Sequence, residues 1–101
     1  MNLRNRVLIE GFLVSDSNLH NTPAGIPVIE GRILHQSSQM QLGSARKVEC
    51  EIPFLALGEI AQAIANLAPE QKLKCKGFLA AKNQRFRHAL VLHIDAFELL
   101  N

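Results

Sequence analysis

Alternation of apolar and polar residues marks five strand-like segments along this chain. The first two, residues 6–14 and 28–35, are rich in β-branched and other apolar side chains. The alternation is clearest in residues 47–54, where every second side chain is apolar. Residues 72–80 and 89–99 repeat the pattern, so the chain predicts five strands.

The segments between these strands carry their own signals. Residues 21–27 hold Pro and Gly at turn spacing and predict a tight loop, so the first two strands are expected to pair as a hairpin. Residues 36–45 are almost wholly polar or small and predict a long exposed loop. In residues 57–67 the apolar period changes to 3.6, with Gly58 near the start and Pro69 after the end, which predicts one short amphipathic helix.

The order of these elements narrows the fold. Three strands, one helix and two strands within a single domain at 1–101 fit an all-β protein with one short helix, the five-stranded Greek-key OB-fold barrel. In that fold the helix closes one end of the barrel between the third and fourth strands. An α+β sandwich has the same list of elements, so the order alone leaves it open.

The apolar residues of the pattern predict the core. The expected barrel core consists of Val7, Ile9, Ile29, Ile33, Val48, Cys50, Ile52, Ile60, Ile64, Leu73, Leu79, Leu90, Leu92 and Ile94. Four phenylalanines within strands are expected in the core or at a dimer interface, namely Phe12, Phe54, Phe78 and Phe97. The two cysteines, Cys50 and Cys75, form no CxxC pair and are expected to be buried free thiols.

Composition restricts the class of protein but does not indicate a function. Hydrophobic residues make up 48% of the chain and charged residues 20%, as in globular proteins. No apolar run approaches the roughly 20 residues of a membrane span, and no signal peptide precedes the first strand, so a cytoplasmic location without membrane association is expected. A net charge of +2 is too small to indicate nucleic acid on its own.

One basic cluster surrounds an aromatic residue between the last two strands. Lys82, Arg85, Arg87 and His88 flank Phe86, on the loop that OB-folds use for ligands. These five residues are the main candidates for nucleic-acid binding. The alternative is a solvated hairpin end that is basic for solubility.

Other polar residues are weaker candidates for the same role. Arg46 and Lys47 precede the third strand and are expected near the binding groove on the same side of the barrel. His20, Thr22 and His35 flank the first turn region, where they could donate hydrogen bonds to phosphate or serve the turn itself.

Three lysines alternate along the fourth strand. Lys72, Lys74 and Lys76 are separated by single residues and therefore share one face. They line a DNA or partner surface, or they protect an outward sheet face against edge pairing. Both interpretations predict exposure.

Nothing in the sequence indicates catalysis. The four histidines have no spacing to one another or to Asp16 and Asp95 that suggests a triad or a metal cluster, and there is no Gly-rich phosphate loop. No enzyme activity, cofactor or metal is expected.

Three stretches resemble bacterial single-strand DNA-binding proteins: NRVLIEG at residues 5–11, NTPAGIPV at 21–28 and KGFL at 76–79. The Gly-Ile-Pro at 25–27 and the short length resemble a shortened member that acts in replication restart. The resemblance implies a homodimeric OB-fold that binds single-stranded DNA with little sequence preference. It also implies primosome partners: a restart helicase, a helicase-loading protein and a single-strand-binding protein.

Two departures from that family change the expected role. The chain has no Trp or Tyr, and Glu49 stands where the family has Trp beside Cys50, so binding shifts from base stacking toward phosphate contacts. The chain also ends without an acidic tail, which argues against a general coating protein, for which a tetramer would be expected. The alternative function is an OB-fold protein-interaction adaptor with weak or lost DNA binding.

Overall fold

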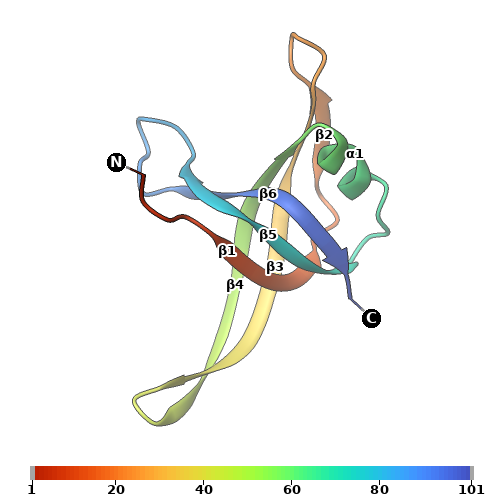
Figure 1. The fold of residues 1–101 in the computed structure, drawn as a ribbon. Helices are drawn as coiled ribbons and strands as arrows, with labels where there is room; N and C mark the ends of the chain where they lie inside the picture. Colours follow the sequence, from red (N-terminus) through yellow and green to blue (C-terminus); the bar gives the residue numbers. More distant parts are fainter. Residues whose placement is uncertain (1, 101) are drawn as a thin grey trace.

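The computed structural model describes residues 2–100. Its elements, in chain order, are β1 (Val7–Leu13), β2 (Asn18–Asn21), β3 (Pro27–Gln41), β4 (Ser44–Leu57), α1 (Glu59–Ala65), β5 (Lys72–Ala81) and β6 (Leu90–Leu99). Figure 1 shows the strands curling around a common centre, with α1 beside the upper end of β4.

The strands form one closed barrel. Their hydrogen-bonded order is β1-β5-β6-β4-β3-β2, and an additional pairing of β1 with β3 closes the ring. All pairings are antiparallel except the one between β4 and β6. The five-stranded barrel with one short helix predicted from the sequence is confirmed, and the α+β sandwich is excluded because the sheet closes on itself through the β1–β3 pairing.

Two glycines allow the strands to approach closely enough for closure. A Cβ atom at Gly11 would lie 2.5 Å from the Ile33 side chain and from the backbone oxygen of Leu34. A Cβ atom at Gly77 would lie 1.8 Å from the backbone oxygen of His93, next to a register shift between Lys76 and Gly77. Such contacts exclude any side chain, so these positions require glycine where β1 crosses β3 and where β5 bends.

The core fills the barrel beneath α1. Its largest fully buried side chains are Phe54, Ile29, Ile33, Ile64, Leu73, Leu92 and Cys75. The helix contributes Ala61 and Ile64, which close one end as the fold predicts. Most of the expected core is thus confirmed, including the buried thiol of Cys75.

Some expected core positions are wrong. Leu79 and Leu90 are 37% and 48% exposed because they lie where β5 and β6 leave the barrel toward their connecting loop. Cys50 is exposed because β4 extends past the barrel at this point, and Val48 is only half-buried for the same reason. Of the phenylalanines expected in the core or at a dimer interface, Phe54 is buried and Phe97 packs against the core. Phe12 and Phe78 are each 38% exposed, so for them the dimer interface stays a prediction.

The prediction of a long loop at residues 36–45 is wrong, because the structure has a long β-hairpin there, which we call the arm. β3 and β4 pair continuously from Val28↔Leu57 to Gln41↔Ser44. Only Leu42 and Gly43 form the turn, both with positive φ, as a two-residue hairpin requires. The backbones of polar residues pair as well as those of apolar ones in a two-stranded ribbon whose two faces are both in water. A run of polar residues is therefore not enough to predict a loop. Figure 1 shows the arm reaching down and away from the barrel.

Smaller differences concern the first third of the chain and the helix. The four exposed residues of β2, Asn18–Asn21, pair with β3 and were not predicted, because they are polar and short. The hairpin therefore joins β2 to β3, while β1 pairs with β3 at two positions only. The helix is shorter than predicted, at Glu59–Ala65. Within residues 2–100, no helix has the length and apolarity to cross a membrane.

Candidate nucleic-acid interface

The loop between β5 and β6 is held in shape by its own backbone and by one side chain. The backbone nitrogen of Lys82 donates to the oxygen of Ala89 at 2.7 Å and so joins the two ends of the loop. Inside it, the nitrogen of Phe86 donates to Oδ1 of Asn83 at 2.9 Å, a turn that asparagine favours. The predicted basic cluster is therefore presented on an ordered, exposed loop.

Phe86 lies at the outer side of this loop with half of its surface exposed. The guanidinium carbon of Arg85 lies 5.7 Å from the centre of the Phe86 ring, within cation–π range. One ring face in contact with a cation and a half-exposed surface suit a base that stacks on the ring while its phosphate pairs with the guanidinium.

Beneath the loop lies an open cleft of about 640 Å³. Its lining comes mainly from two strands that pair with each other here, with Pro53, Phe54 and Leu55 on β4 and Leu90 and Val91 on β6. The remaining lining residues are Glu30, Gly31, Ala80, Ala81, Lys82, Ala89 and His93. The cleft is thus mainly apolar, with the cation of Lys82 at the loop and the carboxylate of Glu30 on β3. Its apolar part suits flat bases, with a phosphate backbone near the loop.

A stacked ring pair borders this region and was not identified from the sequence. The rings of Phe78 and His93 lie 4.9 Å apart and 17° from parallel. They meet because Phe78 on β5 and His93 on β6 are cross-strand partners. The sequence places Phe78 and His93 in two predicted strands but does not reveal the register that makes them neighbours.

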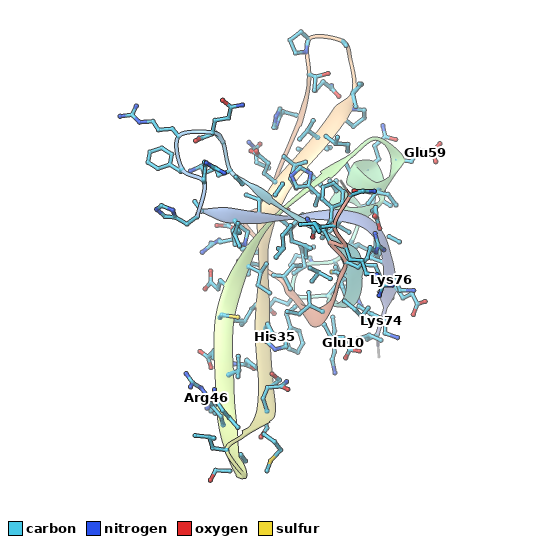
Figure 2. All side chains as sticks on the ribbon, turned by 60° about the vertical axis from the view of Figure 1, so that its left-hand side comes forward. Glu10, His35, Arg46, Glu59, Lys74 and Lys76 are labelled. Atoms are coloured by element: carbon cyan, nitrogen blue, oxygen red, sulfur yellow. The ribbon has the colours of Figure 1, made fainter. Side chains whose placement is uncertain are left out.

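Of the predicted site residues only Lys82 lines the cleft; Arg85, Phe86, Arg87 and His88 lie further out on the loop, and the remaining candidates lie elsewhere. Arg46 lies low on the hairpin arm (Figure 2), where its Nη1 donates to Oε1 of Gln41 at 3.0 Å, and Lys47 follows it. The prediction that these two lie beside the groove is wrong, because the arm carries them away from the barrel. His20 is on exposed β2, and Thr22 Oγ1 accepts a hydrogen bond from the nitrogen of Ile26 at 3.1 Å, which stabilises the turn.

His35 joins β3 to β1 instead of facing the cleft. Its Nδ1 lies 2.7 Å from the backbone oxygen of Glu10, to which it donates, and its Nε2 lies 2.7 Å from Oγ of Ser37. Figure 2 shows His35 and Glu10 on neighbouring segments at the root of the arm. The structure thus gives His35 a structural contact near the end of β1, where few backbone pairs hold β1 to β3.

The outward face of β3 and β4 below the cleft carries more carboxylates than cations. Glu51 and Asp16 both pair with Arg32, Glu51 at 2.5 Å from Nη1. The hydrogen bond to Asp16, followed by the charges of Asp16 and Glu51, raises the pKa of Arg32. Glu49 lies further along the same face, where it accepts a hydrogen bond from Gln36. This local excess of carboxylates is unfavourable for a polyanion.

The lysine stripe lies on a strand that is paired on both sides. Lys74 lies 3.9 Å from Glu98 of β6, while Lys72 and Lys76 are exposed. Because β5 sits between β1 and β6, these lysines do not guard an unpaired edge. Of the two interpretations, the structure therefore favours a partner or nucleic-acid surface.

The buried cysteine does not supply a reactive centre. Burial raises the pKa of the Cys75 thiol to about 11, so it is not a nucleophile at neutral pH. Among residues 2–100, no group of three or more His, Cys, Asp or Glu side chains could hold a metal ion.

The barrel resembles solved single-strand-binding proteins. The wild-type single-stranded DNA binding protein from Thermus aquaticus superposes with a TM-score of 0.77 over 97% of this chain and 50% of that one, at 19% identity, which shows the fold. A family described as "Another single-strand binding protein family" matches residues 5–96. The class of protein is thus that of the single-strand-binding OB-fold proteins.

Two relatives define the family within this class. The structure of the protein PriB from Ralstonia solanacearum has a TM-score of 0.86 and 33% identity and covers 98% of this chain and 100% of that one. The replication restart protein PriB of Nitrosomonas europaea is 34% identical over 91 residues, which are 90% of this chain and 83% of that protein. This chain belongs to the PriB family of replication restart proteins. That family is not one of enzymes, in agreement with the expectation from the sequence.

Proposed function

We propose that this protein binds single-stranded DNA at the β5–β6 loop and the cleft beneath it, as an accessory of replication restart. The observation that carries the proposal is a basic loop that bears a half-exposed Phe86 and whose two ends, at Lys82 and Ala89, line an apolar cleft. Lys82, Arg85 and Arg87 supply charge for the phosphates, while Phe86 and the cleft accept bases. His88, Arg46, Lys47, His20, Thr22 and His35 remain secondary candidates.

The proposed partners follow from the family. As relatives of this chain are named replication restart proteins, we propose that it acts in the bacterial cytoplasm as a homodimer. It would bridge a restart helicase and a helicase-loading protein on DNA that carries single-strand-binding protein. Sedimentation at micromolar concentration should give a dimer, and a tetramer would contradict this arrangement.

A second candidate function is a protein-interaction adaptor with weak or lost DNA binding. Glu49, Glu51 and Asp16 lie on the outward face of β3 and β4 or beside it, and one cation, Arg32, is already engaged by two of them. The chain also lacks Trp and Tyr. Both features reduce the surface on which a single strand could lie.

Titration of a fluorescent oligothymidine at several salt concentrations separates the two candidates. If about four cations contact phosphates, log affinity should fall with log salt at a slope of roughly −3. Replacing Lys82, Arg85 and Arg87 by Ala should weaken binding many-fold and make the slope shallower by about 2. Tight binding at low salt that is lost in this variant supports the proposal, and no binding by the unaltered protein supports the adaptor.

A matched control removes three cations elsewhere. The variant with Arg4, Arg6 and Arg32 replaced by Ala has the same net charge as the loop variant, and all three residues are exposed and lie outside the loop and the lysine stripe. A loop-specific site predicts nearly unchanged affinity in this control. An equal loss in both variants would mean that only overall charge matters, and would overturn the assignment to the loop.

A further inference from the structure

The end of the hairpin arm presents an apolar residue in an unfavourable backbone conformation. Leu42 is fully exposed and has a φ of 51°, in the left-handed region that bulky residues avoid. Met40 beside it is 71% exposed. Asn or Gly would form this turn with less strain, so neither turn geometry nor packing within residues 2–100 accounts for a leucine here.

The surroundings of Leu42 are basic. Residues 38–47 contain Arg46 and Lys47 and no acidic residue. Arg46 and Lys47 pair across the arm with Gln39 and Ser38, within a few residues of the turn. We call residues 40–47 the arm tip. It combines two exposed apolar side chains with two cations.

A hollow with the opposite charge lies at the root of the arm. It has a volume of about 470 Å³ and is lined by Phe12, Leu13, Val14, Ser15, Leu34, Glu51 and Glu70. We call it the root pocket. Phe12 and Leu34 are cross-strand partners and face outward together. Phe12 is 38% exposed, so its ring offers apolar surface to a side chain that enters the pocket.

The charges around the root pocket leave a negative excess. Glu51 and Glu70 line the pocket, and Asp16 and Glu51 share the single guanidinium of Arg32. Three carboxylates against one cation leave an excess of two negative charges. Lys72 lies across from Phe12 but lines the neighbouring groove. The pocket therefore complements the arm tip in two ways. Its apolar residues can pack against the apolar side chains of the tip, and its carboxylates can pair with the cations of the tip.

We propose that the arm tip of one copy docks into the root pocket of a second copy, with Leu42 inserted beside Phe12 and Leu34 and with Arg46 and Lys47 near Glu51 and Glu70. A chain cannot fill its own pocket, because seven residue steps of paired strand separate Gln41 from Leu34, about 24 Å at the usual strand rise. Each copy carries both patches, so the contact closes within a pair of copies if it is reciprocal and continues from copy to copy if it is not. It would align neighbouring copies independently of the loop site.

Disulfide capture without nucleic acid tests the contact. In a Cys50→Ser background, Ser44→Cys labels the arm tip and Ser15→Cys labels the root pocket, both exposed positions. Buried Cys75 stays unreactive. One of the two proteins carries a size tag, so that the mixed disulfide is resolved on a non-reducing gel. The control pairs Ser44→Cys with Ala24→Cys, an exposed loop position outside the lining of the root pocket.

The tip–pocket pair should crosslink several-fold more than the control pair, and added salt should lower the yield. Leu42→Asn, which suits the turn but removes the apolar side chain, should reduce the yield about tenfold or more. Glu70→Lys should reduce it as well. Equal yields for the two pairs, or a yield that ignores Leu42→Asn, would overturn the proposal.

Oligothymidine titration of the same variants keeps this inference separate from the proposed function. If Leu42→Asn lowers DNA affinity and leaves the crosslink intact, the arm tip contacts nucleic acid and the self-docking inference is wrong. If crosslinking fails while DNA binding is normal, the inference falls and the loop site stands.

Discussion

Gly77 shows how one missing side chain sets the course of a strand. A Cβ there would lie 1.8 Å from the backbone oxygen of His93, so β5 and β6 would have to separate. Gly77→Ala should therefore lower the free energy of unfolding by about 3 kcal/mol, the upper range for overpacking. Urea unfolding followed by circular dichroism measures this. A loss of a few tenths would show that the bulge adapts freely.

The two cysteines should differ sharply in reactivity. Cys50 is exposed, whereas burial raises the pKa of Cys75 from 9.0 to about 11. A thiol reagent at pH 8 should modify one cysteine in the folded protein and two after denaturation. Since the raised pKa favours the folded state only while the thiol is neutral, this contribution to stability should fade as the pH rises from 9.0 through about 11. Two reactive thiols in the folded protein would contradict the burial of Cys75.

At the scale of elements, the hairpin arm offers a direct test of the strain at its turn. Leu42→Asn should raise the free energy of unfolding by up to about 1 kcal/mol, because Asn tolerates the left-handed conformation. Thermal unfolding compared with the unaltered protein measures the change. Leu42→Val, which keeps a bulky side chain at positive φ, is the matched control and should not stabilise.

The elements also show what the sequence could predict. Strands in the barrel alternate because one face is buried, so β1, β5, β6 and the barrel part of β4 were found with small errors at their ends. β2 and the arm have no buried face, and their polar residues therefore carried no strand signal. The basic loop was found because residues close together in sequence form it.

The cleft was beyond the reach of the sequence for a related reason. Its walls join Leu55 on β4 to Val91 on β6, and the stacked pair joins Phe78 to His93. Those contacts depend on register and on closure of the barrel. Arg46 and Lys47 were misplaced by the same cause, because a paired arm holds them away from the barrel where a loop was expected to fold back.

At the scale of the whole molecule, the barrel is held together very unevenly. β5 and β6 pair along nearly their whole length, but β4 meets β6 at only Phe54↔Leu92 and Leu55↔His93. β1 meets β3 at two pairs as well. Phe54, Leu55 and His93, which lie at the β4–β6 junction, also line the cleft.

Because so few backbone pairs join β4 to β6, we expect local opening of the barrel at this junction. Amide hydrogen exchange measured by NMR should show faster exchange at that junction than in the β5–β6 ladder, through local opening well below the global unfolding free energy. A single strand lying across the cleft would bind both sides of the junction, so saturating oligothymidine should slow exchange there first. Uniform protection before and after binding would contradict this. If exchange does slow at the junction on binding, the DNA itself adds a contact between β4 and β6 and stabilises the closed barrel.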